Sequence, residues 1–174
     1  MNITLKKLEQ FGNCTGCCAG RYKGCGTVGE SSLRWWACMC GSYFPDRCSR
    51  RVNPYYDKRV PEMVVGAGTV LTTEQVDRAV NAGAQFIVSP GFNPAVVKYC
   101  IEKNIPVTPG VVTPSEMEKA IEMGLEVVKF FPAEPSGGLE MIKAVAAPYT
   151  MLKFMPTGGI NPKILFRIFN MKNS

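Results

Sequence analysis

Lys129 is the residue whose type and setting most directly indicate chemistry. It lies in the middle of Glu126–Phe131, an apolar run with the β-branched and aromatic composition of a strand. Side chains alternate across a strand, so Lys129 shares one face with Val127 and Phe131, and the residues between them share the other. Burial disfavours the charged form of an amine, and a neutral lysine can attack a ketone to form an imine. A non-catalytic lysine would instead extend to the open end of the strand or pair with Glu134.

Short loops of small residues follow this run and others like it: Gly66–Thr69, Ser89–Gly91, Thr108–Gly110 and Thr157–Gly159. If the preceding strands are parallel, their C-terminal ends form one active-site rim, where glycine N–H groups can approach an anion and threonine hydroxyls can bind a substrate. Gly158 and Gly159 follow what would be a seventh strand, a place where barrels often hold phosphate. Taken alone, each loop is more simply a tight turn, and the GAG triplet lacks the third spaced glycine of a dinucleotide site.

The composition narrows the chemistry that these residues can do. The 174 residues include no histidine, which excludes histidine-dependent nucleophiles and most catalytic zinc sites. The net charge of +6 is concentrated in residues 1–60, which hold ten Lys or Arg and four Asp or Glu, whereas residues 61–174 hold ten of each. Seven of the eight cysteines also lie in the first segment. A uniformly basic nucleic-acid-binding protein would not divide in this way.

The sequence lacks the signals of export. No apolar run reaches membrane-spanning length, and the first ten residues lack the apolar core of a signal peptide. We therefore expect a cytoplasmic protein with no membrane partner and no disulfide framework.

From residue 61 onward, strand and helix patterns alternate about every 19 to 26 residues. The expected strands are Met63–Val70, Gln85–Ser89, Ile105–Thr108, Glu126–Phe131 and Leu152–Pro156. Helices are expected after N-terminal capping residues at Thr72 or Thr73, Asn93 and Thr113, and Gly83 and Gly124 lie where two of them should end. This order predicts an α/β protein with parallel strands buried on both faces, as in a barrel or a doubly wound sheet. Residues 13–60 show neither period and do not look like a continuation of the same fold.

The motifs together resemble one enzyme family. The segments GAGTV, SPG, VVKFFPAE and MPTGGI occur in the order and spacing of the 2-keto-3-deoxy-6-phosphogluconate (KDPG) aldolases, a family that includes the 4-hydroxy-2-oxoglutarate (KHG) aldolases. The resemblance runs without a gap from about Pro61 to Pro162. It implies a (β/α)8 TIM barrel that is incomplete here, with strands three to seven recognisable and the first two and the eighth missing or out of frame.

The resemblance also implies a reaction. A class I aldolase needs no metal or cofactor, because the protonated imine formed by Lys129 is the electron sink that releases pyruvate from a keto-acid substrate. The substrate would be KDPG, cleaved to pyruvate and glyceraldehyde 3-phosphate, or KHG, cleaved to pyruvate and glyoxylate. The substrate-binding residues would be Thr69 at the carboxylate, Pro90 and Phe131 at the pocket wall, Thr157 near the substrate, and Gly158 and Gly159 at the phosphate. The resemblance further implies a homotrimer with a small-molecule keto-acid substrate and no nucleic-acid partner.

The resemblance fails before residue 61. The family's second strand reads like Glu-Val-Thr-Phe-Arg-Thr and supplies a catalytic glutamate and a carboxylate-binding arginine, and this motif is absent. Codons for Cys40–Asp46 exist that, shifted by one nucleotide, read Ala-Glu-Val-Thr-Phe-Arg-Thr, and codons for Asn13–Cys18 exist that read Ile-Val-Pro-Val-Val. We therefore interpret residues 1–60 as an aberrant Cys-rich segment, a frameshifted remnant of the first two βα units, and residues 61–174 as the aldolase barrel portion.

Two alternatives remain open from the sequence. Residues 1–60 could instead be a genuine metal- or nucleic-acid-binding module on a non-catalytic protein, although the paired Cys-x-x-Cys knuckles of a zinc site are absent. The second is a related Schiff-base barrel acting on the galactonate-derived isomer of the substrate.

Overall fold

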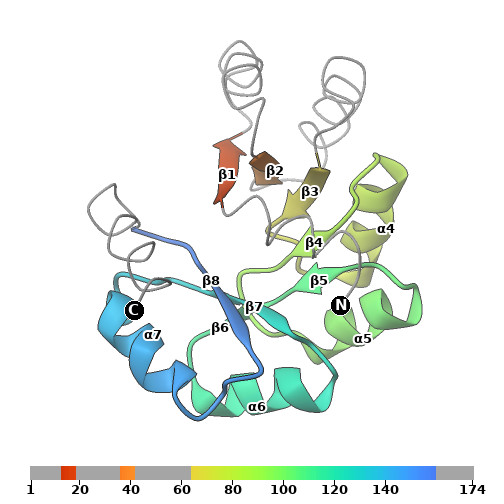
Figure 1. Ribbon diagram of the computed structural model, residues 1–174. Coiled ribbons are helices and arrows are strands. Elements are labelled where there is room, and N and C mark those ends of the chain that lie inside the picture. The colour runs from red at the N-terminus through yellow and green to blue at the C-terminus, as the bar shows by residue number, and fades with distance from the viewer. Residues whose placement is uncertain (1–12, 19–35, 42–63, 160–174) are drawn as a thin grey trace. The chain divides into compact units, whose positions relative to one another are not determined.

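The computed structural model describes residues 13–18, 36–41 and 64–159, the first two ranges through their backbone (Figure 1). It divides into unit 1, Met1–Thr108, and unit 2, Pro109–Ser174, which are described separately. The strands are β1 (Asn13–Cys18), β2 (Trp36–Gly41), β3 (Val64–Gly68), β4 (Ile87–Val88), β5 (Val107–Thr108), β6 (Gly110–Val111), β7 (Val127–Phe130) and β8 (Lys153–Pro156). The helices are α4 (Thr73–Asn81), α5 (Pro94–Glu102), α6 (Pro114–Glu122) and α7 (Gly138–Ala146). No helix in these ranges is long and apolar enough to cross a membrane.

The described strands of each unit pair in parallel. In unit 1 the order is β1-β2-β3-β4-β5, and in unit 2 it is β6-β7-β8. From β3 onward, helices α4, α5, α6 and α7 separate the strands everywhere except between β5 and β6, which confirms the α/β class and the parallel strands expected from the sequence.

β1 and β2 lie in the segment where the sequence showed no regular period. β1 pairs with β2 from Asn13↔Trp36 to Cys18↔Gly41, and β2 pairs with β3 from Ala37↔Val64. The expectation that residues 13–60 do not continue the fold is therefore wrong for these two strands. The strand ladder is made by backbone N–H and C=O groups, which every residue except proline supplies, so it can form without an alternating apolar pattern.

The loop Thr108–Gly110 is another place where the structure corrects the sequence analysis. It does not lead from a strand into a helix, because β5 ends at Thr108 and the chain resumes as β6 directly after Pro109, where β6 pairs with β7 in the sheet of unit 2. Proline lacks the N–H that a continuous ladder needs, so the strand expected at Ile105–Thr108 ends as β5 before that residue, and β6 is a further strand that was not expected.

The helix boundaries follow local signals in the sequence. α4 begins after Thr72, whose Oγ1 accepts a hydrogen bond from Gln75 N–H (3.2 Å). α5 begins after Asn93, whose Oδ1 accepts one from Ala95 N–H (3.0 Å). These side chains satisfy N–H groups that the first turn of a helix leaves unpaired. The expected cap residues are confirmed.

α6 shows the same signal in a stronger form. The Glu116 carboxylate accepts hydrogen bonds from the N–H groups of Val112 and Thr113 and from the Thr113 hydroxyl, at 2.8 to 2.9 Å. Burial alone would raise the pKa of Glu116, but these hydrogen bonds outweigh it and lower the pKa. After α4 and α6 the chain turns at Gly83 and Gly124, with φ of 92° and 77°, as expected for helix-terminating glycines.

The core of unit 1 lies between its strands and its helices. α4 buries Val76 and Ala79, and α5 buries Val96, Val97 and Cys100. Burial raises the pKa of the Cys100 thiol to about 11, so this cysteine stays protonated at neutral pH. On the sheet, Phe86 is 1 % exposed and its ring lies over Gly66, where an added Cβ would be 2.2 Å from Cζ. Gly66 is therefore required by packing.

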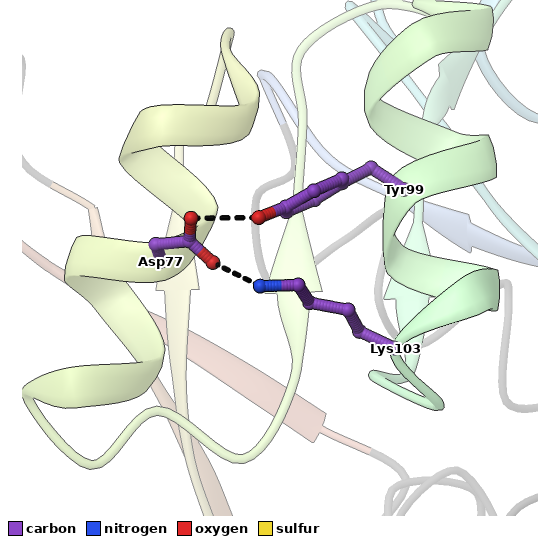
Figure 2. Close-up of polar contacts among 3 residues, drawn as sticks. All are labelled: Asp77, Tyr99 and Lys103. Carbon is purple, nitrogen blue, oxygen red and sulfur yellow. Dashed lines mark hydrogen bonds and ion pairs between the residues drawn. The ribbon is translucent and has the colours of Figure 1, made fainter.

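A polar cluster joins the outer surfaces of α4 and α5 (Figure 2). Asp77 accepts hydrogen bonds from the Tyr99 hydroxyl (2.7 Å) and from Lys103 Nζ (2.9 Å). Lys103 Nζ also lies 4.6 Å from the centroid of the Tyr99 ring, within the range of a cation–π contact. The hydrogen bonds from Tyr99 and Lys103 lower the pKa of Asp77, and those with Tyr99 and Asp77 raise the pKa of Lys103.

Unit 2 has its own core and its own polar tie. Its fully buried side chains include Val111 of β6, Met117 of α6, and Val128 and Phe130 of β7. The Tyr149 hydroxyl donates a hydrogen bond to Glu118 (2.9 Å), which raises the pKa of the tyrosine. Each unit thus combines an apolar interior with a tyrosine–carboxylate bond at its surface.

Candidate active site

Lys129 occupies the central strand of the three-stranded sheet of unit 2. Its N–H donates to the carbonyl oxygen of Pro109 (2.8 Å), and its register partners are Gly110 on β6 and Met155 on β8. Val128 and Phe130 are 0 % exposed, while Lys129 is half-buried on the opposite face, as the alternation predicted. Register partners share a face, so Gly110 places no side chain beside the lysine on the β6 side.

The aromatic ring of Phe131 lies beside the lysine amine. Lys129 Nζ is 4.3 Å from the centroid of the ring, which is the geometry of a cation–π contact. An imine formed at this nitrogen is an electron sink only when it is protonated and therefore cationic. The ring face stabilises a positive charge at that position, so the geometry suits both the resting ammonium and a protonated imine.

The turn after β8 lies against the same ring. Gly158 and Gly159 have φ of 92° and 80°, a conformation that L side chains rarely adopt. A Cβ added at Gly158 would lie 3.2 Å from Cδ2 of Phe131. The carbonyl oxygens of Thr157 and Gly158 accept hydrogen bonds from the N–H groups of Ala133 (2.7 Å) and Glu134 (3.0 Å). The segment after β7 therefore holds the turn after β8 in place.

The turn presents polar groups that the protein does not satisfy. Among the residues that the structure describes, Thr157 Oγ1 is a buried side-chain oxygen without a hydrogen-bond partner. Within the same ranges, the N–H groups of Gly158 and Gly159 have no protein acceptor. Buried polar groups in native proteins are normally paired, so the unpaired Thr157 hydroxyl indicates a place where a ligand binds, and the more accessible Gly158 and Gly159 N–H groups lie beside it. Two adjacent N–H donors and a hydroxyl are suited to an anion.

Unit 1 contributes a different kind of strand end. Thr69, directly after β3, has a φ of 59°, which is rare for a β-branched residue and costs about 1–3 kcal/mol. The next residue, Val70, donates its N–H to the carbonyl oxygen of Val88 on β4 (3.2 Å), so the ends of β3 and β4 are side by side. Pro90 follows this end of β4 and is half-buried. Thr69 and Pro90 therefore belong to neighbouring strand ends of unit 1.

The sequence-based site residues fall into two groups. Unit 2 brings together Lys129, Phe131 and the turn Thr157–Gly159, whereas Thr69 and Pro90 belong to unit 1. Of the two non-catalytic alternatives for the lysine, the ion pair with Glu134 is not observed within the described ranges.

Sequence analysis missed two residues that shape this site. Gly110 was assigned to a loop, although it lies on β6 in register with Lys129 and places no side chain there. Glu134 was considered only as an ion-pair partner, although its side chain lies against Gly159. The FPAE motif places Glu134 just after the strand of Lys129, but no sequence pattern gives its contact with Gly159.

The metal alternative has no counterpart in the described residues. No group of three or more His, Cys, Asp or Glu side chains is arranged there to hold a metal ion. The cysteines of the proposed module, from Cys14 to Cys48, lie outside the residues whose side chains the structure describes.

Comparison with known proteins places these motifs in a family. The family model for KDPG and KHG aldolase matches residues 47–173. A 2-dehydro-3-deoxy-phosphogluconate aldolase from Treponema pallidum (strain Nichols) is 55% identical over 100 residues, covering 58% of this chain and 48% of the relative. The chain spans about half the length of the curated relatives it matches.

Solved structures are similar over more of the chain. The 2-keto-3-deoxy-6-phosphogluconate aldolase of Zymomonas mobilis ZM4 with 3-phosphoglycerate has a TM-score of 0.84 and 27% identity, covering 96% of this chain and 79% of that one. The KDPG aldolase of Legionella pneumophila, with pyruvate captured as a covalent carbinolamine intermediate, has a TM-score of 0.80 and 28% identity, covering 90% and 76%. These neighbours show that the α/β fold is that of an aldolase barrel.

Proposed function

The chain belongs to the KDPG and KHG aldolase family, and from this premise we propose that it is a class I aldolase whose Schiff-base residue is Lys129. The observation that carries the proposal is the position of Lys129 Nζ, 4.3 Å from the Phe131 ring and beside a strand position that has no side chain. The carbinolamine of pyruvate in the Legionella pneumophila relative is the covalent chemistry expected of such a lysine.

The reaction follows from the imine. Lys129 adds to the C2 ketone of the substrate and loses water to form a protonated imine. The C4 hydroxyl loses its proton, the C3–C4 bond breaks, and its electron pair moves into the imine, which becomes an enamine. An aldehyde leaves, and protonation and hydrolysis of the enamine release pyruvate and restore the lysine. No metal is required in this sequence of steps, because the iminium nitrogen accepts the electrons.

We propose KDPG and KHG as substrates, giving glyceraldehyde 3-phosphate or glyoxylate together with pyruvate. Thr69 would bind the pyruvate carboxylate, and the strain that this residue bears supports a role for its hydroxyl. Phe131 and Pro90 would form apolar walls. Thr157, Gly158 and Gly159 would bind the far end of the substrate, and their unpaired donors support an anion there.

The test is pyruvate release, followed by coupling to lactate dehydrogenase and NADH oxidation. The unmodified chain should release pyruvate from KDPG or KHG, and Lys129→Met should not. Lys153→Met is the matched control, since Lys153 is an exposed strand lysine whose register partner is Val127 on β7. Equal rates for the two variants would refute the assignment of Lys129.

We also propose that residues 1–60 are a frameshifted remnant of the first two βα units. The position of β1 supports this, because Asn13–Cys18 is the segment that the shifted frame reads as Ile-Val-Pro-Val-Val. The curated relatives, in contrast, align with only about 100 residues of this chain. The coding DNA decides the matter: a single-nucleotide shift must recover both strand motifs, and a coding sequence that recovers neither would refute the proposal.

A second test of the frameshift compares the activity of the present chain with that of a protein made from a gene in which the reading frame is restored. The restored gene would encode the glutamate and arginine of the second strand, and the glutamate would accept and return the protons of imine formation and C–C cleavage. General acid–base catalysis commonly contributes about 10²–10⁴-fold, so we expect kcat to rise by that order over the present chain.

We propose that the protein assembles as a homotrimer in the cytoplasm. Exposed apolar side chains occur in each unit, Leu71 and Ile101 in unit 1 and Met151 in unit 2, and they support contacts with another copy. A cytoplasmic location is expected because a charged phosphorylated sugar acid does not cross a membrane unaided. Sedimentation equilibrium measures the assembly directly, and a single monomeric species would contradict it.

A further inference from the structure

Glu134 makes contacts that link the turn after β8 to the first residue of α7. A Cβ added at Gly159 would lie 2.6 Å from Cβ and 2.9 Å from Cγ of Glu134. A Cβ added at Gly138 would lie 2.8 Å from Oε1 of the same side chain. The Glu134 N–H meanwhile donates to the carbonyl oxygen of Gly158 (3.0 Å). One residue therefore contacts the turn through both its backbone and its side chain.

The aliphatic part of Glu134 fixes the shape of the turn. Two successive glycines at positive φ have a large conformational freedom, which a binding turn must lose before its N–H groups point at a ligand. The methylene groups of Glu134 close one side of Gly159. The hydrogen bond from the Glu134 N–H to the Gly158 carbonyl oxygen holds the peptide group between Gly158 and Gly159.

The carboxylate brings a negative charge to the same place. Its oxygens lie against Gly138, the first residue of α7, one bond beyond the Cγ that lies against Gly159, and no cation pairs with it within the described ranges. A charge at this distance repels an anion bound to the turn, and the repulsion grows with the charge of that anion. It acts on a phosphate dianion and leaves a neutral or short substrate end unaffected.

We propose that Glu134 is a positioning residue that sets the charge selectivity of the turn Thr157–Gly159: its methylenes shape the anion subsite, and its carboxylate reduces the preference for a phosphorylated over an unphosphorylated substrate end. This inference rests on the proposed function, because it takes the turn to be the subsite for the far end of the substrate. Glu134 acts through the turn and takes no part in bond breaking.

The experiment compares the binding of 3-phosphoglycerate, the compound present in the Zymomonas mobilis relative, with that of glycerate. Both affinities are measured by calorimetry on the full chain, in Glu134→Gln, and in Glu140→Gln. Glutamine keeps the methylenes and removes the charge. Glu140 is an exposed residue in the first turn of α7, so its substitution makes the same charge change away from the turn. Borohydride trapping of pyruvate on Lys129 is recorded for each protein.

We expect Glu134→Gln to raise the ratio of 3-phosphoglycerate to glycerate affinity about threefold or more at low salt, with the gain shrinking as salt is added. Glu140→Gln should leave the ratio unchanged, and all three proteins should trap pyruvate equally. Two results would overturn this inference alone, provided that the proteins trap pyruvate. One is an affinity ratio that is unchanged or lower in Glu134→Gln, and the other is a rise in Glu140→Gln equal to that in Glu134→Gln. No trapping in the unmodified chain would overturn the proposed function and this inference with it.

Discussion

The turns after β3 and after β8 both pair a threonine with glycine, yet they reach positive φ in opposite ways. After β8 the glycines take the left-handed conformation, so Thr157 remains unstrained and presents an unpaired hydroxyl. After β3 the threonine itself takes it, at a φ of 59° for Thr69. A glycine at position 69 would avoid that cost. The difference indicates that the side chain of Thr69 is used, whereas at Gly158 and Gly159 the backbone is used.

The largest effect is expected from Gly159→Ala, which places a side chain where the backbone should be exposed. The new Cβ meets Cβ and Cγ of Glu134 at under 3.0 Å, and a φ of 80° strains any L residue. We expect a loss of about 2–4 kcal/mol in the free energy of unfolding, measured by urea denaturation, from overpacking and left-handed strain together. Binding of 3-phosphoglycerate should also weaken, because the new side chain stands where the backbone N–H should meet the ligand. We expect a fall of at least about tenfold, which corresponds to about 1.4 kcal/mol of binding free energy.

Unchanged stability and binding in Gly159→Ala would show that the turn adapts, and the contrast between the two turns would lose its basis. Gly91→Ala is the matched control. It lies in another strand-end loop, and an added Cβ there would meet nothing within 4 Å.

A smaller effect, with opposite signs in two measurements, is expected from Thr69→Gly. Relief of the left-handed strain should raise the free energy of unfolding by roughly 1 kcal/mol or less, after the greater entropy loss of glycine is subtracted. The pyruvate concentration needed for half-maximal borohydride trapping should rise, since the carboxylate loses a hydroxyl donor. If the variant loses stability, Thr69 is held by packing, and its strain says nothing about function.

The smallest effect is expected at the surface of unit 1, where neither turn is involved. The pKa of Asp77 is lower in the folded chain than in the unfolded one, so its contribution to stability is complete above the unfolded pKa of about 4 and is lost as the pH falls through the folded value. Lys103 has a raised pKa, so its contribution is complete below about pH 10 and is lost at more alkaline pH.

Asp77→Asn should therefore lower the melting temperature at pH 7 and lower it by less at pH 3, because part of the carboxylate's contribution is lost below the unfolded pKa. The effect should be slight at both pH values, because an exposed ion pair is screened by solvent. Thermal melts of both proteins across this range provide the measurement. If Asp77→Asn lowers the melting temperature equally at both pH values, then Asp77 stabilises the fold only through its hydrogen bond with Tyr99.

How much of the fold and of the candidate site could be predicted from the sequence depended on how far apart in the chain the interacting residues lie. The caps Thr72 and Asn93 act on residues two or three positions away; Asn93 was predicted correctly, and the other cap was narrowed to Thr72 or Thr73. The alternation that puts Lys129 opposite Val128 is equally local. Glu134 against Gly159 joins residues 25 positions apart, and no local pattern encodes it. Threonine disfavours positive φ, so the conformation of Thr69 ran against its own propensity and could not be predicted.

Borohydride trapping with pyruvate, followed by intact mass and peptide mapping, tests the central claim most directly. The account predicts one stable adduct on Lys129, lost in Lys129→Met and retained in Lys153→Met, whose lysine lies on the same sheet. An adduct that persists in Lys129→Met, or a chain that forms none while a full-length relative traps normally, would contradict the assignment of Lys129 as the Schiff-base residue of this chain.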